Sequence, residues 1–93
     1  MLEFEWDSRK AAANLRKHGV AFEQAVAAFA DPHGVERIDD REDYGEERVI
    51  LFGFAGAALV TIAYVERAAR IRVISARKAT QGEEQDYYRQ ETP

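Results

Sequence analysis

Polar and apolar residues alternate at the very start of the chain. Phe4 and Trp6 stand between three acidic residues, Glu3, Glu5 and Asp7. A period of two residues predicts a short, half-buried strand. Asp7 is also a good helix cap, because its carboxylate can accept hydrogen bonds from the first N–H groups of a helix. The sequence therefore predicts a strand that leads directly into a helix.

The apolar period then lengthens to three or four residues, which predicts two helices. The first should run from Ser8 to about Lys17 and stop at Gly19, a residue suited to the left-handed position after a helix. The second should run from Phe22 to about Ala30, where Asp31-Pro32 ends it because proline cannot continue the hydrogen-bond ladder. The residues expected to face the core are Ala11, Ala12, Leu15, Phe22, Ala25, Val26 and Phe29.

From Gly34 onward the alternating period returns, in four segments rich in β-branched and aromatic residues. The segments are VERID (35–39), ERVILFGF (47–54), ALVTIAYV (58–65) and RIRVISA (70–76). Their short connections favour an antiparallel meander. The last segment, 80–91, opens with Thr80 and has Glu83 three residues later, which is a capping-box signature and predicts a C-terminal helix.

The order strand, helix, helix, four strands, helix predicts one α+β domain over residues 1–93. We expect an antiparallel β-sheet with the two N-terminal helices and the C-terminal helix packed on one face. The opposite face would then be left for function or for a partner.

Composition narrows the kind of protein. The chain of 93 residues has no cysteine and two histidines, so we expect neither a disulfide nor a dedicated metal site, and no cofactor. No apolar stretch approaches the roughly 20 residues needed to span a bilayer, and the acidic start does not resemble a signal peptide. We therefore expect a cytoplasmic protein that does not bind a membrane.

Charge is unevenly distributed along this chain, whose net charge is −4. Residues 31–48 carry eight acidic and three basic groups, whereas residues 67–78 carry five basic groups and no acidic one. A local basic patch attracts phosphates within a Debye length, roughly 8 Å at physiological salt, even on an acidic protein. The acidic loop at 39–47 within the first of these segments has two open interpretations, a contact with a basic partner or a contribution to solubility.

Arg72 is the most informative of these cations, because a guanidinium in mid-strand is costly to bury unless it meets an anion. Its planar fork of donors suits a phosphate. The alternative is a salt bridge to a carboxylate on a neighbouring strand, such as Glu46 or Glu47. Simple alternation would place Arg72 and Arg77 on opposite faces, unless a β-bulge intervenes.

Two further groups are candidates for proton transfer. Glu46 and Arg48 are two residues apart, so both would face the same side of a strand, where Glu46 is either a general base or one half of a cross-strand ion pair. His18 follows Lys17 at the end of the first predicted helix, where the helix dipole favours the imidazolium. The alternative for His18 is that it caps carbonyls or packs at the core edge.

Together these segments resemble one family. The motifs W-D, N-x-x-K-H-G-V-x-F, G-E-x-R and I-R-x-I-S-A-R occur in an order similar to that of the BrnT toxins of bacterial type II toxin–antitoxin systems. The resemblance implies a RelE-like fold and a metal-independent endoribonuclease that cuts RNA and stops translation. It also implies neutralisation by a BrnA-type antitoxin, through which alone the complex would contact DNA.

The resemblance also selects site residues. Those expected to be catalytic are Arg72, Glu46, Arg77, Arg48 and His18, and those expected to bind RNA are Lys17, Arg67, Lys10, Ser75 and Tyr64. In this hypothesis the RNA 2′-hydroxyl attacks the adjacent phosphate, with Glu46 or His18 as base and the arginines stabilising the phosphorane. The alternative is a non-catalytic module, in which the arginines pair with carboxylates of a partner chain.

Overall fold

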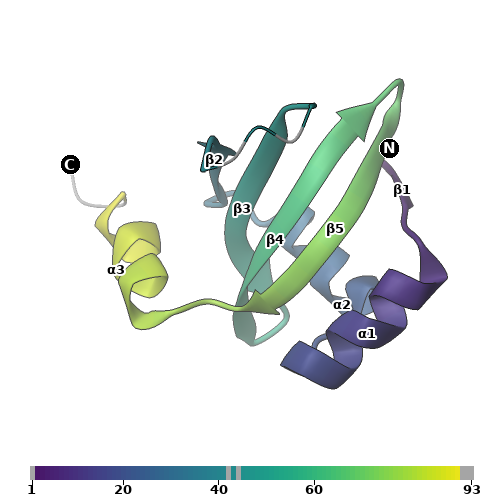
Figure 1. The fold of residues 1–93 in the computed structure, drawn as a ribbon. Coiled ribbons are helices and arrows are strands. Elements are labelled where there is room, and N and C mark those ends of the chain that lie inside the picture. The colour runs from purple at the N-terminus through teal and green to yellow at the C-terminus, as the bar shows by residue number, and fades with distance from the viewer. Residues whose placement is uncertain (1, 42, 44, 91–93) are drawn as a thin grey trace.

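The computed structural model describes residues 2–41, 43 and 45–90 as a five-stranded sheet with helices on both faces (Figure 1). The elements are β1 (Glu3–Glu5), α1 (Ser8–His18), α2 (Phe22–Ala25), the 3₁₀ helix η1 (Val26–Ala30), β2 (Val35–Asp39), β3 (Arg48–Ala55), β4 (Ala58–Arg67), β5 (Arg70–Lys78) and α3 (Gln81–Arg89). The predicted α+β class and element order are confirmed. None of the helices in the described part has the length and apolar character needed to cross a membrane.

The strands lie in the order β1-β5-β4-β3-β2. Strands β2 to β5 form the predicted antiparallel meander, whereas β1 runs parallel to the first part of β5, with Glu3 opposite Arg70 and Glu5 opposite Arg72. The sheet is therefore mostly, not wholly, antiparallel. This parallel pair requires a long crossover, which the helices and the meander provide.

Helix α1 starts and stops as predicted, but it buries a different residue. The Asp7 carboxylate accepts hydrogen bonds from the N–H groups of Arg9 and Lys10, and Gly19 adopts the left-handed conformation with φ 71°. Leu15, expected in the core, is 49% exposed and Ala12 is also exposed, whereas Asn14 is 7% exposed. The side of α1 that faces the sheet is centred on Asn14, because the Asn14 side-chain amide binds backbone groups of Val20 and of Ala76 on β5.

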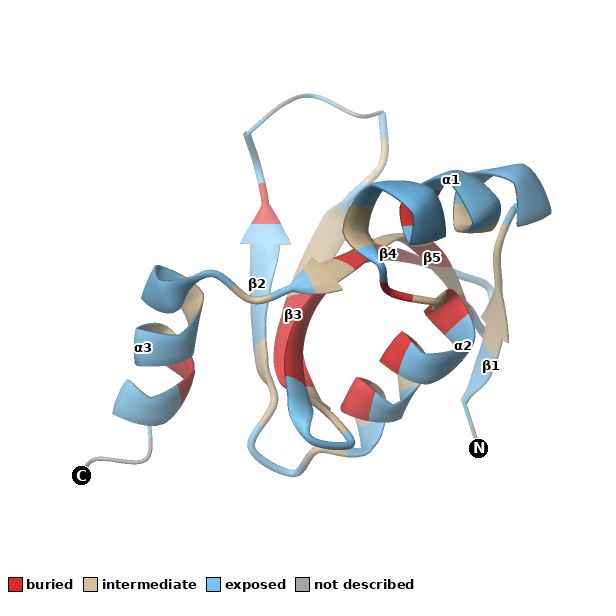
Figure 2. Cartoon of the chain, turned by 90° about the horizontal axis from the view of Figure 1, so that it is seen from below, coloured by how far each residue is buried: buried red, intermediate tan, exposed pale blue. Residues whose placement is uncertain are grey.

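The main core lies between the sheet and the α2–η1 segment (Figure 2). Phe22, Ala25 and Ala28 are fully buried against apolar side chains of β3, β4 and β5. Gly53 on β3 permits close contact, because a Cβ there would lie 3.0 Å from the Ala28 carbonyl oxygen. The predicted second helix thus forms as a single α-helical turn that continues as a 3₁₀ helix.

Helix α3 packs on the opposite face of the sheet, which corrects the prediction that all helices share one face. Its Tyr87 is buried against Phe52 and Leu59 in a second cluster. Strand β3 carries apolar residues on both faces, so both must be covered, and α3 covers one end of the second face. The predicted capping box of Thr80 and Glu83 is present, and residue 91, the predicted helix end, lies outside the described residues.

Candidate functional site

A β-bulge in β5 determines which side chains share a face. Ala63 lies opposite Ser75 and Tyr64 lies opposite Val73, so Ile74 is an extra residue on β5. The bulge shifts the alternation of side chains by one position. Before it Ile71 and Val73 are buried in the main core, and after it Ala76 is. Simple alternation from end to end of β5 is therefore wrong for this strand.

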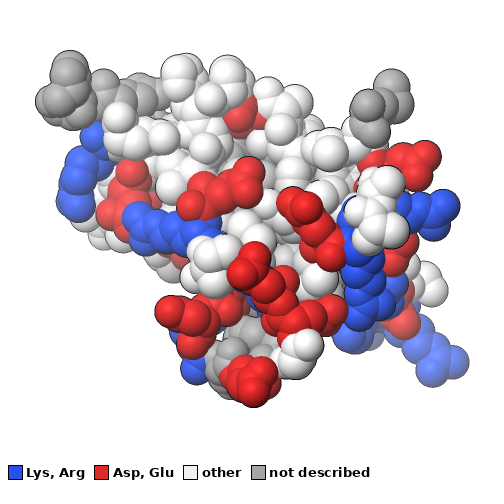
Figure 3. Space-filling model, turned by 90° about the horizontal axis from the view of Figure 1, so that it is seen from above, with Lys and Arg blue, Asp and Glu red and all other residues white. Residues whose placement is uncertain are grey.

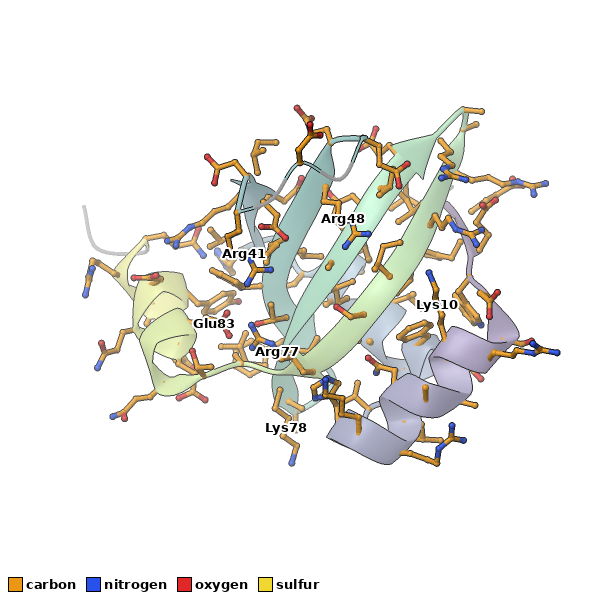
Figure 4. The ribbon with its side chains drawn as sticks, in the orientation of Figure 1. Lys10, Arg41, Arg48, Arg77, Lys78 and Glu83 are labelled. Carbon is orange, nitrogen blue, oxygen red and sulfur yellow. The ribbon has the colours of Figure 1, made fainter. Side chains whose placement is uncertain are left out.

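The consequence is that Arg72 and Arg77 lie on the same face. We call the face of the sheet opposite the main core the open face, and α3 covers only the part of it near β2 and β3. The residues that the register places on the open face include Arg48, Ile50, Thr61, Ala63, Val65, Arg67, Arg70, Arg72, Ser75 and Arg77. In Figure 4 the side chains of Arg48 and Arg77 extend over this face, with Arg41 and Glu83 beside them.

Arg77 is held by a network at the start of α3. Its Nη1 and Nη2 donate to the two carboxylate oxygens of Glu83 at 2.7 and 2.9 Å. Glu83 also accepts hydrogen bonds from the Thr61 hydroxyl at 2.9 Å and from the Thr80 N–H at 2.8 Å. Burial alone would raise the pKa of Glu83, but the hydrogen bonds from Arg77, Thr80 and Thr61 outweigh it and lower the pKa to about 2. The hydrogen bond to Glu83 raises the pKa of Arg77.

The other arginines of the β4–β5 hairpin are paired as well. Arg72 donates to Glu5 on β1 at 3.1 Å, so its partner is a carboxylate on a neighbouring strand but neither Glu46 nor Glu47. Arg70 lies 3.4 Å from Glu3 and 3.6 Å from Glu5. Arginine side chains therefore remain on the surface while much of their charge is balanced within the chain.

Glu46 lies in the loop before β3, because that strand begins only at Arg48. The two residues are therefore not neighbours on one face of a strand, which corrects that prediction. Glu46 instead forms an ion pair with Arg67 at 3.0 Å. This pair joins the loop to the turn between β4 and β5, as the ion-pair alternative for Glu46 expects.

Helix α1 supplies cations that are not paired. It carries Arg9, Lys10, Arg16 and Lys17 and no acidic residue, and none of these four has an ion pair within the described part of the chain. Figure 4 shows Lys10 extending from α1 toward β5, beside the open face. His18 is the last residue of α1 and is half-buried. Positive charge without an ion pair among the described residues thus lies mainly on α1, and in the basic hairpin it lies on Lys78.

Tyr64 is not on the open face. Its side chain is almost fully buried in the main core, in edge-to-face contact with Phe29, and its hydroxyl donates to Glu36 at 2.8 Å. Burial, followed by the hydrogen bond to Glu36, raises the pKa of Tyr64 well above its ordinary value. The structure therefore gives Tyr64 a core position, which corrects its prediction as an RNA-binding residue.

Acidic side chains gather at the end of the sheet where β2 leads toward β3 and β4 turns into β5 (Figure 3). Residues 42 and 44 of the predicted acidic loop lie outside the described residues. Asp39 in this region is buried and accepts hydrogen bonds from Arg41 at 2.8 and 2.9 Å. Among the described residues no group of three or more His, Asp or Glu side chains is placed to hold a metal ion.

Sequence reasoning missed Glu83 and Thr61 as members of the site. The sequence explains Glu83 by its capping role alone, and Thr61 by its place in an apolar strand. A usable signal is nevertheless present, because Arg77 lies at the end of a predicted strand, six residues before Glu83, and the short link must bring the strand end close to the helix start. Thr61 could be found only from the register between β4 and β5.

Comparison with protein families gives one match. Residues 6–83 match a family model described as ribonuclease toxin, BrnT, of type II toxin–antitoxin system. The matched segment extends from Trp6 to Glu83, and so includes every element from α1 to β5 and the first three residues of α3. A search of curated proteins found no match.

Proposed function

Because the chain belongs to the BrnT family of ribonuclease toxins of type II toxin–antitoxin systems, we propose that it is a metal-independent endoribonuclease whose open face binds and cleaves RNA. Cleavage of RNA would inhibit translation. A BrnA-type antitoxin in the cytoplasm would neutralise it, and DNA would be contacted only through that antitoxin.

The single observation that supports this site most strongly is the bulge at Ile74. It brings Arg72 and Arg77 to the same face as Arg48, so three guanidinium groups border one surface. Guanidinium groups stabilise the charge that develops on a phosphorane. Ser75 lies on β5 between Arg72 and Arg77 and offers a hydroxyl to the same substrate.

In the proposed reaction a base removes the proton of the RNA 2′-hydroxyl, and the 2′-oxygen attacks the adjacent phosphorus. The bond from phosphorus to the 5′-oxygen breaks, and that oxygen takes up a proton. The products are a 2′,3′-cyclic phosphate and a free 5′-hydroxyl. Electrostatic stabilisation by positioned donors is usually the largest part of such catalysis, which suits a site built from arginines.

The two candidate bases lie toward opposite ends of β5. Glu46 pairs with Arg67 at the β4–β5 turn. His18 lies one helical turn after Asn14 on α1, and Asn14 binds Ala76 near the other end of β5. One phosphate cannot contact both. His18 would act beside Arg77, and Glu46 would act beside Arg67.

Substrate binding is assigned to the unpaired cations of α1 together with the open face. Lys10 lies four residues before Asn14 and Lys17 three residues after it, so helical spacing places both on the same side of α1 as Asn14, which binds β5. An RNA strand on the open face would pass along them. Phosphate contacts supply most of the affinity of sequence-independent binding. Arg67 would contribute less, because Glu46 already balances its charge.

The test is inducible expression with measurement of the translation rate and of RNA integrity. Wild type is compared with Arg72→Ala, Arg77→Ala, Glu46→Ala and His18→Ala, and circular dichroism checks that each variant folds. Arg89→Ala is the matched control, because Arg89 is an exposed arginine on α3 that lies outside the open face. Rapid RNA cleavage that is lost in the folded Arg72→Ala and Arg77→Ala variants supports the proposal, and intact RNA with folded wild type contradicts it.

The ion pairs of the hairpin favour a second candidate function, a non-catalytic module that binds a partner chain. Arg72, Arg70 and Arg67 already pair with carboxylates of this chain. The carboxylates of a partner chain could take the place of those carboxylates and pair with the same arginines. In that case all variants and wild type would leave RNA intact, while Arg72→Ala would still weaken partner binding.

A further inference from the structure

We infer that Glu83 is a positioning residue that fixes the guanidinium of Arg77 for contact with a substrate phosphate. The inference rests on the proposed function, since it concerns the same open face. Glu83 itself would not touch the RNA. Its role would be to hold Arg77 in one orientation before the substrate arrives.

The hydrogen bonds of Glu83 leave its carboxylate little freedom. Oε1 accepts from Arg77 Nη1, from the Thr61 hydroxyl and from the Thr80 N–H, while Oε2 accepts from Arg77 Nη2. The donors come from β5, β4 and the start of α3, so three elements fix one carboxylate. A bidentate pair of this kind sets the plane of the guanidinium as well as its position.

The remaining donors of Arg77 are available to a substrate. A guanidinium has five N–H groups. Two are directed to Glu83 and a third to the Lys78 carbonyl oxygen at 3.3 Å, which leaves two for other partners. Arg77 can therefore bind a phosphate oxygen while its pair with Glu83 stays intact.

Charge supports a fixed rather than a titrating role. The low pKa of Glu83 keeps it ionised at neutral pH, so it is unsuited to donate or accept protons during the reaction. The Glu83 side chain is 18% exposed and that of Arg77 is 35% exposed, which protects the pair from solvent more than a typical surface ion pair. A positioned, partly buried pair retains its geometry when the substrate leaves.

Glu83 also closes the capping box of α3, and a substitution must separate the two roles. Glutamine serves at this position of a capping box as glutamate does. Glu83→Gln should therefore preserve α3 while it removes the charge that holds Arg77. Thr80→Ala is the reciprocal variant, because it removes the capping hydroxyl and leaves the carboxylate in place.

The experiment measures kcat and KM of purified wild type, Glu83→Gln, Thr80→Ala and Arg77→Lys on a short single-stranded RNA, together with the urea midpoint of each. We expect Glu83→Gln to lower kcat at least tenfold with less than a threefold change in KM. The double variant Glu83→Gln with Arg77→Lys should be no slower than Arg77→Lys alone. Thr80→Ala should lower the urea midpoint and leave kcat unchanged.

Two results would overturn the positioning role while the ribonuclease proposal stands. In one, wild type is active, Arg77→Lys is slow and Glu83→Gln retains the wild-type kcat. In the other, Glu83→Gln raises kcat, which would mean that Glu83 competes with the phosphate for Arg77. RNA left intact by folded wild type would contradict the proposed function itself.

A readout that does not depend on cleavage tests the geometry directly. In ¹⁵N spectra of arginine side chains, the Nη–H signals of Arg77 should be resolved and slowly exchanging in wild type, because the bidentate pair restricts guanidinium rotation. They should broaden or merge in Glu83→Gln and remain resolved in Thr80→Ala. Identical Arg77 signals in wild type and Glu83→Gln would overturn the inference even if RNA cleavage were never observed.

Discussion

Asn14 on α1 binds both backbone groups of Ala76 on β5. Its amide nitrogen donates to the Ala76 carbonyl at 2.7 Å, and its amide oxygen accepts from the Ala76 N–H at 3.1 Å. Among the described residues β1 pairs only with residues 70–72 of β5, so no described strand pairs with the rest of that edge. The Asn14 side chain takes the place of a strand there and joins α1 to the sheet in a buried position.

We predict that Asn14→Ala is strongly destabilising. The change leaves the two groups of Ala76, and the Val20 carbonyl that also accepts from Asn14, without a partner in a buried site. Each unsatisfied buried group costs on the order of 1–3 kcal/mol, so with three such groups the free energy of unfolding should fall by at least about 3 kcal/mol in urea denaturation. Gln24→Ala, at an exposed helical position, is the control and should change it by less than about 0.5 kcal/mol.

Two glycine-to-alanine substitutions should have opposite signs. A Cβ on Gly53 would lie 3.0 Å from the Ala28 carbonyl oxygen and 3.2 Å from its Cβ, so β3 and η1 would be forced apart. The cost of overpacking is about 1–3 kcal/mol. Gly82 is in α3, where a Cβ would make an ordinary van der Waals contact with the Thr80 Oγ1 at 3.9 Å, and alanine there should add about 0.5–1 kcal/mol of stability. Thermal unfolding of Gly53→Ala and Gly82→Ala measures both changes in stability. If the two variants changed the stability equally, the close packing of η1 on β3 would be contradicted.

RNA binding should depend on the unpaired lysines of α1 more than on the paired arginines of the hairpin. We predict that Lys10→Ala and Lys17→Ala each weaken binding of single-stranded RNA and reduce the slope of log K against log salt by about 0.7. Arg70→Ala should change the slope less, because Glu3 and Glu5 already balance that charge. Fluorescence anisotropy at several salt concentrations measures these slopes. If Arg70→Ala changed the slope more than Lys10→Ala and Lys17→Ala do, the RNA-binding surface would lie on the hairpin and not on α1.

Stability should decrease in acid through two carboxylates. The pKa of Glu83 in the folded protein is lowered from 4.5 to about 2, and that of Asp31 is also lowered, since hydrogen bonds from Phe54, Tyr87 and His33 outweigh its burial. A group whose pKa is lower in the folded state stabilises the fold above its unfolded pKa, and this contribution is lost as pH falls toward the folded pKa. The free energy of unfolding should therefore decline between about pH 5 and pH 2, by at most about 1.4 kcal/mol per pH unit for each group. Glu83→Gln should have a shallower decline, and parallel curves for wild type and the variant would contradict the shift.

Most elements of this fold were predictable because their signals are local. Asp7 and Gly19 set the ends of α1, and Thr80 with Glu83 sets the start of α3, through hydrogen bonds within a few residues. The four strands of the meander follow from alternation and short links. These features depend on neighbours in the sequence, so a single sequence is enough to find them.

The features that were missed depend on contacts distant in sequence. Asn14 is buried in place of Leu15 because it meets Ala76, 62 residues later. Helix α3 takes the second face because apolar residues of β3 and β4 there need cover, and nothing within α3 itself indicates the face. The pairing of Arg77 with Glu83 and Thr61, and of Arg72 with Glu5, likewise requires knowledge of which strands are neighbours.

The extra residue Ile74 divides β5 into two halves, and the alternation of side chains between the two faces of the sheet shifts by one position from one half to the other. On one side of Ile74 even-numbered residues face away from the main core, and on the other side odd-numbered residues do. A single-residue deletion at Ile74 would leave both halves of the strand on their present faces, because Val73 and Ser75 already lie opposite the adjacent residues Tyr64 and Ala63. If Ile74 were instead paired in a regular ladder, one half would turn over and place arginine where the core requires an apolar residue. One residue with no partner of its own thus keeps two arginines five positions apart on a common surface.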